Sequence, residues 1–204
     1  MNKSYKDLLV LQFADAVVQH AKKYVPQAFA GDIEAAKYLA VSLNNHERGA
    51  AAVLMWQLKV KRSAFQAFFD SVWLHDHAHV ISAAATRRRL TSMFKYADFP
   101  LPDFPELLQV WRGTVGIKPE EASKGYSWTC NRDVACWFAT RYDANESQVI
   151  TATIRREEIV YFSNERQEQE VVLAKEPHFF CVDGDADNWL ATRNRWLSES
   201  TKGS

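Results

Sequence analysis

The sequence is poor in several features that mark specialised classes of protein. It has three cysteines without the spacing of a disulfide framework, which indicates a reducing compartment. Basic and acidic residues both number 25, so there is no net charge to hold nucleic acid by bulk attraction. No apolar run is long enough to cross a membrane, and charged residues interrupt the segment where a signal peptide has its apolar core. We expect a protein of a bacterial or host cytosol, or one delivered by a route without a conventional signal. No membrane partner is expected, and nucleic acid is disfavoured as a partner.

The remaining composition is that of a folded globular protein. Apolar residues make up 47% of the 204 residues, enough to bury a sizeable core in one large domain or in a small domain with an appendage. In the N-terminal half, apolar residues recur at the three-four spacing of amphipathic helices. Pro26 is expected to end the first helix and Asp32 to cap the second. The expected helices cover roughly 5–17, 33–43, 47–69 and 80–96.

Three histidines in this half resemble a metal-binding cluster, because His75, His77 and His79 flank Asp76. In a helix, only His75 and His79 share a face. No recognisable zinc spacing is completed nearby. We interpret the cluster as a polar junction between helices and predict no metal site.

A proline-rich stretch, 99–105, separates two halves of different pattern. It holds three of the six prolines, which lack the backbone N–H and disfavour helix in the preceding residue. We therefore expect a helical domain over 1–98, an extended connector over 99–105, and a second domain over 106–204.

The second domain changes to the alternating pattern of strands. Its strands and helices predict an α+β domain built on a mostly antiparallel sheet with flanking helices. Asn131 is expected to cap a helix behind the second strand. Strands are expected over 107–111, 125–129, 148–154, 160–162, 168–173 and 178–182, and helices over 131–142 and 189–197.

Two of these strands carry polar residues suited to a nucleotide. Arg112 ends an apolar run and is followed by Gly113. A planar guanidinium fits a pyrophosphate, and glycine allows close approach to the main chain. On the second strand, Ser127 and Thr129 share one face while Trp128 points to the other, which we predict to be the core. The two hydroxyls could hold a sugar.

A third strand carries two carboxylates. Glu168 and Glu170 stand at i and i+2, so alternation predicts that both project from one face. A carboxylate can stabilise the positive charge that develops on a ribose carbon when its bond to nicotinamide breaks. Taken singly, each motif has an ordinary explanation: a surface ion pair for Arg112, and solvated strand faces for the hydroxyls and carboxylates.

Together and in this order, the motifs resemble those of the ADP-ribosyltransferases of the Arg-Ser-Glu class, which includes bacterial and phage enzymes. The resemblance covers roughly 106–182 and rests on Arg112-Gly113, Tyr126-Ser127-Trp128-Thr129 and Glu168-Gln169-Glu170. It implies that the second domain has the fold of such a transferase and uses NAD as its substrate. The chain departs from the pattern in its Ser-Trp-Thr triplet. Arg112 and Ser127 are also only 15 positions apart, so we expect no helix between them.

The chemistry and the resemblance assign a role to each carboxylate. Glu170 is the candidate that stabilises the transition state of nicotinamide release. Glu168 would orient and deprotonate the nucleophile. In relatives, this first glutamate accompanies modification of arginine, so the resemblance implies an arginine acceptor.

The remaining candidates would bind NAD. Arg112 would neutralise the pyrophosphate, and the main chain of Gly113 would hold the carboxamide of nicotinamide. Ser127 would orient Glu170 or the ribose. Thr129 and Tyr126 would form the wall beside it.

The leading hypothesis is a transferase that moves ADP-ribose from NAD to a protein and serves as a toxin or a phage-encoded modifier. NAD hydrolysis is an alternative, and so is an inert protein that only binds partners. The helical half is expected to dock the target. Its aromatic residues are expected to contact the second domain: Trp56, Phe65, Phe68, Phe69 and Trp73.

Overall fold

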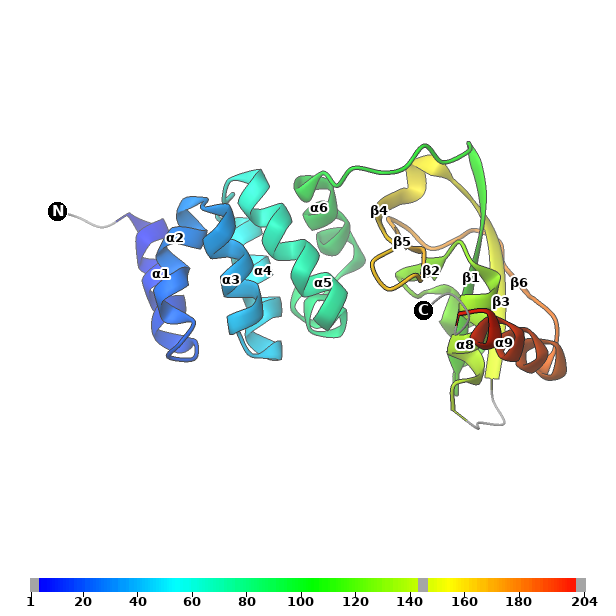
Figure 1. Cartoon of the computed structure of the whole chain (residues 1–204). Helices are drawn as coiled ribbons and strands as arrows, with labels where there is room; N and C mark the ends of the chain where they lie inside the picture. The colour runs from blue at the N-terminus through cyan, green and yellow to red at the C-terminus, as the bar shows by residue number, and fades with distance from the viewer. Residues whose placement is uncertain (1–3, 143–146, 201–204) are drawn as a thin grey trace. The chain divides into compact units, whose positions relative to one another are not determined.

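The computed structural model describes residues 4–142 and 147–200, and these form an α+β protein, as predicted. The chain divides between Phe99 and Pro100 into two compact units. We call them the helical unit (residues 4–99) and the sheet unit (residues 100–142 and 147–200) (Figure 1). The division falls inside the proline-rich stretch. Within the described residues, no helix has the length and apolarity needed to span a bilayer.

The helical unit is a series of helices that pack on chain neighbours or, as between Ile33–Ser42 and Arg62–Ala84, on the next helix but one (Figure 1). Asp32 caps α3, since its carboxylate accepts a hydrogen bond from the Ala35 N–H at 2.7 Å, which confirms the predicted cap. Pro26 lies in the first turn of α2, where its missing N–H is tolerated, so the prediction that it ends a helix was wrong. The helices are α1 (Tyr5–Ala16), η1 (Lys22–Tyr24), α2 (Val25–Ala30), α3 (Ile33–Ser42), α4 (Asn45–Gln57), α5 (Arg62–Ala84) and α6 (Arg87–Ala97).

Two breaks between helices were missed, and the expected spans 47–69 and 80–96 were wrong for the same reason. Lys59, between α4 and α5, has a φ of 51°, and Ala85, between α5 and α6, has a φ of 61°. Each left-handed residue ends a helix although neither is glycine. Apolar spacing continues across both breaks because the helices on either side bury residues in one core.

The histidine cluster lies within α5 at a kink. Asp76 there has non-helical dihedral angles, with φ −143° and ψ 34°. Its carboxylate pairs with Arg48 of α4, and both side chains are largely buried. A Cβ on Gly49 would lie 2.3 Å from the carbonyl oxygen of His79, so the backbones of α4 and α5 are in close contact. Within the described part of the chain, no group of three or more His, Cys, Asp or Glu residues is arranged to hold a metal ion.

Four of the five aromatic residues expected at a domain contact lie in the core of the helical unit. Phe65 and Phe69 stack with ring centroids 5.1 Å apart, and Trp73 meets Phe94 edge-on at 4.8 Å. Trp56 packs under the ammonium group of Lys59. The four fully buried members of the set are Phe65, Phe68, Phe69 and Trp73.

The connector, 99–105, has no regular secondary structure, and its residues pack within the unit to which each belongs. The ring of Phe99 lies 6.2 Å from that of Phe69 in the helical unit. Leu101 and Phe104 pack against the core of the sheet unit. Asp103 forms an ion pair with Arg156 at 2.8 Å. Phe99 therefore belongs to the helical unit, and the rest of the stretch belongs to the sheet unit.

The sheet unit contains a six-stranded sheet in the order β4-β5-β2-β1-β3-β6, with every neighbouring pair antiparallel. This confirms the predicted antiparallel sheet. Asn131 caps the helix behind β2 through its side-chain oxygen, which accepts from the Asp133 N–H at 2.9 Å. The strands are β1 (Leu107–Val115), β2 (Ser127–Thr129), β3 (Ser147–Arg155), β4 (Ile159–Ser163), β5 (Glu170–Leu173) and β6 (Cys181–Val182).

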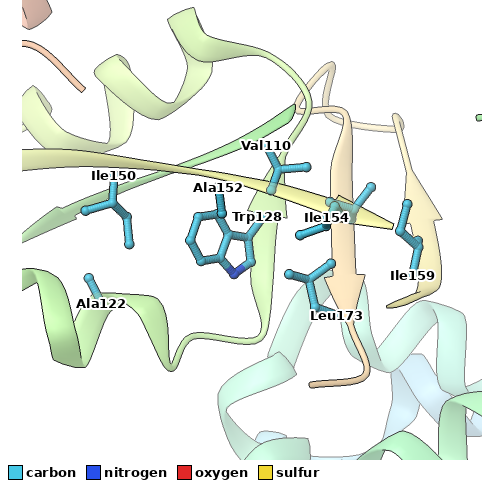
Figure 2. Close-up of a cluster of buried hydrophobic side chains, with 9 residues drawn as sticks. Val110, Ala122, Trp128, Ile150, Ala152, Ile154, Ile159 and Leu173 are labelled. Carbon is cyan, nitrogen blue, oxygen red and sulfur yellow. The ribbon is translucent and has the colours of Figure 1, made fainter. Parts of the chain in front are cut away.

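Each face of the sheet is covered. On one face, Trp128 is buried among aliphatic side chains from β1, β3 and β5 and Ala122 of α7 (Pro119–Ser123) (Figure 2). This confirms the inward orientation of Trp128. It also shows that the expected absence of a helix between Arg112 and Ser127 was wrong, because five residues suffice for the single turn of α7. Helix α8 (Arg132–Thr140) packs on the other face, and α9 (Ala186–Ser200) packs on α8.

An acidic turn, Asp183-Gly184-Asp185, precedes α9 and holds that helix to the sheet. The carboxylate of Asp183 accepts hydrogen bonds from the indole of Trp111 at 2.8 Å and from the Nε of Arg132 at 2.7 Å. Asp185 accepts from the Asn188 N–H at 2.9 Å and so starts α9. The carboxylates of Asp183 and Asp185 therefore have structural roles: one links the turn to β1 and α8, and the other caps α9.

Candidate active site

The three motifs of the sequence come together on three neighbouring strands. Arg112 lies on β1, Ser127 on β2 and Glu170 on β5, and the sheet places β2 between the other two. Ser127 and Glu170, 43 positions apart in the chain, therefore lie on paired strands, and Arg112 lies one strand further along the sheet. This proximity follows from strand order, which no single motif determines.

One row of side chains crosses the sheet through this region. Thr129 is in register with Trp111 on one side and with Glu170 on the other, and Glu170 is in register with Ser163. Residues directly opposite in antiparallel strands project from the same face, so Thr129 and Glu170 are side-by-side. Ser127, two positions before Thr129, projects from that face as well. The Glu170 side chain is nearly buried, with 8% of the residue exposed.

Arg112 leaves β1 on the opposite face from this row, because it alternates with Trp111. Its guanidinium nevertheless reaches β2, where it donates a hydrogen bond to the Ser127 carbonyl oxygen. It also packs against Gly125, whose missing Cβ would lie 2.2 Å from the Cζ of Arg112. Arg112 thus contacts the main chain of Ser127, while the side chains of Ser127 and Glu170 project from the same face of the sheet.

The junction between β1 and β2 is narrow. Among the described residues, Trp111 with Thr129 is the one pair in register between these strands, whereas β1 and β3 share nine pairs. Beyond that pair, Gly113 and Ser127 do not continue the ladder. We call this junction the seam. It divides the sheet into β1-β3-β6, which carries Arg112, and β2-β5-β4, which carries Ser127 and Glu170.

The expected position of Glu168 on a strand was wrong. β5 begins at Glu170, and Gln167 and Gln169 have φ values of 58° and 46°, so alternation does not extend back to Glu168. The carbonyl oxygen of Glu168 instead accepts a hydrogen bond from the Thr129 hydroxyl at 2.5 Å. The loop is thereby held against the end of β2.

Glu168 still lies close to the other charges of the site. Burial raises the pKa of the Glu168 carboxyl above its ordinary value, and the negative charge of Glu170 raises it further. Arg166 and Arg141 act in the opposite direction, with Arg166 the stronger. The Arg166 Nη2 is 3.2 Å from the Glu168 Oε2, and 22% of the Glu168 side chain is exposed. The two carboxylates therefore interact although they do not share a strand.

Two further candidates are placed by backbone contacts. A Cβ on Gly113 would lie 1.8 Å from the carbonyl oxygen of Ala135, so glycine is required here by the packing of α8 on β1. Its proposed contact with nicotinamide stays a prediction. The carbonyl oxygen of Tyr126 accepts from the Leu173 N–H at 3.0 Å, which extends the pairing of β2 with β5.

The sequence interpretation missed two arginines near Glu168. Arg166 stands two positions before it, a spacing that carries no signal by itself. Arg141 follows α8, where its guanidinium lies over the rings of Phe138 and Tyr142, at 5.0 Å from each centroid. Only the folded loop brings these cations to the carboxylate.

An open depression elsewhere on the sheet unit does not contain these residues. It lies near the opposite end of β1, and Arg156 in its wall already pairs with Asp103. It lacks the combination of hydroxyls, carboxylates and cation found at the seam. Its lining residues are Leu101, Glu106, Arg155, Arg156, Glu157 and Ile159.

Comparisons with models of protein families, with curated proteins and with solved structures found no significant match. The resemblance to ADP-ribosyltransferases therefore rests on the motifs of the chain.

Proposed function

We propose that the chain is an ADP-ribosyltransferase that transfers ADP-ribose from NAD to an arginine of a target protein and releases nicotinamide. The observation that carries the proposal is the placement of Arg112, Ser127 and Glu170 on three adjacent strands, with the Arg112 guanidinium donating across the seam to the Ser127 carbonyl oxygen. A cation, a hydroxyl and a nearly buried carboxylate are the groups that splitting a nicotinamide dinucleotide requires.

Glu170 supplies the electrostatic part of the reaction. When the bond between nicotinamide and ribose breaks, positive charge develops on the ribose carbon, as in glycoside hydrolysis. A carboxylate with 8% exposure is held by the strand and does not have to reorganise as this charge appears. Thr129, in register beside it, is also buried and bonded to Glu168 and Asn131. The wall next to Glu170 is therefore rigid.

Arg112 and Ser127 supply the binding part. The guanidinium is held at the seam by the Ser127 carbonyl and by the space above Gly125. A guanidinium has five donors in a planar fork, which suits the pyrophosphate of NAD. The Ser127 hydroxyl is on the Glu170 face, where it would contact the ribose. Gly113 and Tyr126, next to Arg112 and Ser127 in the chain, would complete the binding residues.

Glu168 is the proposed base for the acceptor. Its carboxylate already lies 3.2 Å from one guanidinium, that of Arg166, so the position is suited to an arginine side chain. The raised pKa, caused first by burial, makes this carboxyl a better proton acceptor than an exposed glutamate. As the acceptor nitrogen bonds to the ribose carbon, its proton would pass to Glu168.

Hydrolysis of NAD is a second candidate function. Because Arg166 already pairs with Glu168, a target arginine has to displace it, whereas water does not. Water would then accept the ribose at a rate that competes with transfer. The helical unit is proposed to dock the target protein and so favour transfer.

Incubation with labelled NAD and a cell lysate tests the proposal. The wild-type chain should release nicotinamide and label a protein of the lysate. Glu170→Gln should lower both activities by about 10²–10³-fold, as loss of one preorganised electrostatic group does. Glu176→Gln, an exposed glutamate of the same unit, is the matched control and should behave as wild type. Near-normal turnover by Glu170→Gln, or no nicotinamide release by the wild type, would contradict the proposal.

A further inference from the structure

The loop between β4 and β5 presents a guanidinium to the carboxylate proposed as the acceptor's base. Arg166 Nη2 lies 3.2 Å from Glu168 Oε2, and half of the Arg166 side chain is exposed. A terminal nitrogen of Arg166, which would attack a ribose carbon, is thus already ion-paired with the Glu168 carboxylate, which would take its proton.

The loop holds this geometry through its own hydrogen bonds. The carbonyl oxygen of Asn164 accepts from the Gln167 N–H at 3.0 Å, and its side-chain oxygen accepts from the Gln169 N–H at 3.2 Å. Gln167, between the two charged residues, is left-handed with a φ of 58°. Such a residue reverses the chain, so Arg166 and Glu168 meet although they are only two positions apart.

The loop is also fastened to the catalytic strands. The Thr129 hydroxyl donates to the Glu168 carbonyl oxygen at 2.5 Å, and the Cys130 N–H donates to the Gln169 carbonyl oxygen at 3.0 Å. Two hydrogen bonds therefore hold the loop that carries Arg166 to the end of β2, where Thr129 lies beside Glu170.

We propose that Arg166 is a modification site: the chain transfers ADP-ribose from NAD to its own Arg166. This inference rests on the proposed function. In the step, the bond between the ribose carbon and nicotinamide breaks, and nicotinamide leaves with the electron pair. A terminal nitrogen of Arg166 forms the new bond to the same carbon, and its proton passes to Glu168. No further reactant is required.

Other arginines near the site are held by different contacts. The Arg141 guanidinium lies over the rings of Phe138 and Tyr142. Arg112 donates to the Ser127 carbonyl oxygen at the seam. Arg166, by contrast, forms an ion pair with the Glu168 carboxylate. An acceptor on the same chain also has a high effective concentration, which favours its modification over a diffusing target.

The test uses the purified full-length chain with NAD and no other protein. We expect the intact mass to rise by one ADP-ribose, and fragmentation of the peptide to place the group on Arg166. The rate per molecule should not change with protein concentration, since the step is intramolecular. Arg166→Lys should lower incorporation by about tenfold or more, because the preorganised acceptor is lost. Arg156→Lys, an exposed arginine paired with Asp103, should incorporate as the wild type does.

Several results would overturn the inference. Release of nicotinamide without incorporation would do so while leaving the proposed function intact. Incorporation at Arg141 or elsewhere that persists in Arg166→Lys would have the same effect, as would a rate per molecule that rises with protein concentration. No release of nicotinamide, even with a cell lysate present, would overturn the proposed function and the inference together.

Discussion

Gly125→Ala isolates the role of the Arg112 guanidinium without touching a charged residue. An ideal Cβ at position 125 lies 2.2 Å from the Cζ of Arg112, 2.3 Å from its Nε and 2.6 Å from its Nη2. These distances are far below van der Waals contact, so the guanidinium has to move. It is the end of a flexible side chain and can do so. The backbone of Gly125 is outside the left-handed region and accepts alanine.

The magnitude follows from the contact that is lost. A hydrogen bond from a charged group contributes about 1.5–3 kcal/mol, and alanine returns about 0.4–1 kcal/mol by restricting the unfolded chain. We therefore expect a loss of about 1–2 kcal/mol in the free energy of unfolding. If the displaced cation no longer meets the pyrophosphate, the same 1.5–3 kcal/mol corresponds to a rise of about 10–150-fold in the KM for NAD.

The assay combines nicotinamide release at varied NAD concentration with unfolding in urea. Gly113→Ala is the comparison, because its Cβ would lie 1.8 Å from the Ala135 carbonyl oxygen and 2.8 Å from the Ala139 nitrogen. Those atoms belong to a helix backbone, so the variant should lose about 3 kcal/mol or more in stability. An unchanged KM in Gly125→Ala would refute the role of Arg112. So would a loss of activity that only follows the fraction of unfolded protein.

Three other changes test separate parts of the structure. Transfer should fall as the pH is lowered through the pKa of Glu168, which burial raises above its ordinary value, because the protonated acid cannot act as a base. Glu168→Gln should lose this pH dependence and retain hydrolysis of NAD. Asp183→Ala removes the acceptor of the Trp111 and Arg132 hydrogen bonds and should lower the free energy of unfolding by about 2–3 kcal/mol in urea, a value near zero contradicting the anchoring role. A chain that begins at Pro100 should release nicotinamide but no longer label the target, and full transfer by it would show that the helical unit does not select the target.

Local patterns predicted the elements whose signals lie within a few residues. The change of period between the two halves separated helices from strands, and Asp32 and Asn131 cap helices as expected. Alternation placed Trp128 in the core and its two hydroxyl neighbours on the other face. These predictions needed only the geometry of a single element.

The parts that could not be predicted depend on single backbone conformations or on distant contacts. Lys59 and Ala85 end helices in left-handed conformations that their side chains do not favour, so the sequence carries no mark of either break. Gln167 and Gln169 also have left-handed conformations, and these keep Glu168 off the strand in a way that the sequence does not signal. Arg112 could be identified as a candidate, but its position depends on where the chain places Gly125, which its own neighbours do not encode.

The seam has a consequence for the way the site is assembled. The cation and the carboxylate belong to different half-sheets, which share the registered pair of Trp111 with Thr129 and the contact of Arg112 with Ser127. The distance between the Arg112 guanidinium and the Glu170 carboxylate therefore depends on the seam, where the strands share one registered pair. A dinucleotide bound by both halves would act as a cross-link over that line. Its affinity and the rigidity of the sheet would then rise together, and NAD would stabilise the unit that we propose to split it.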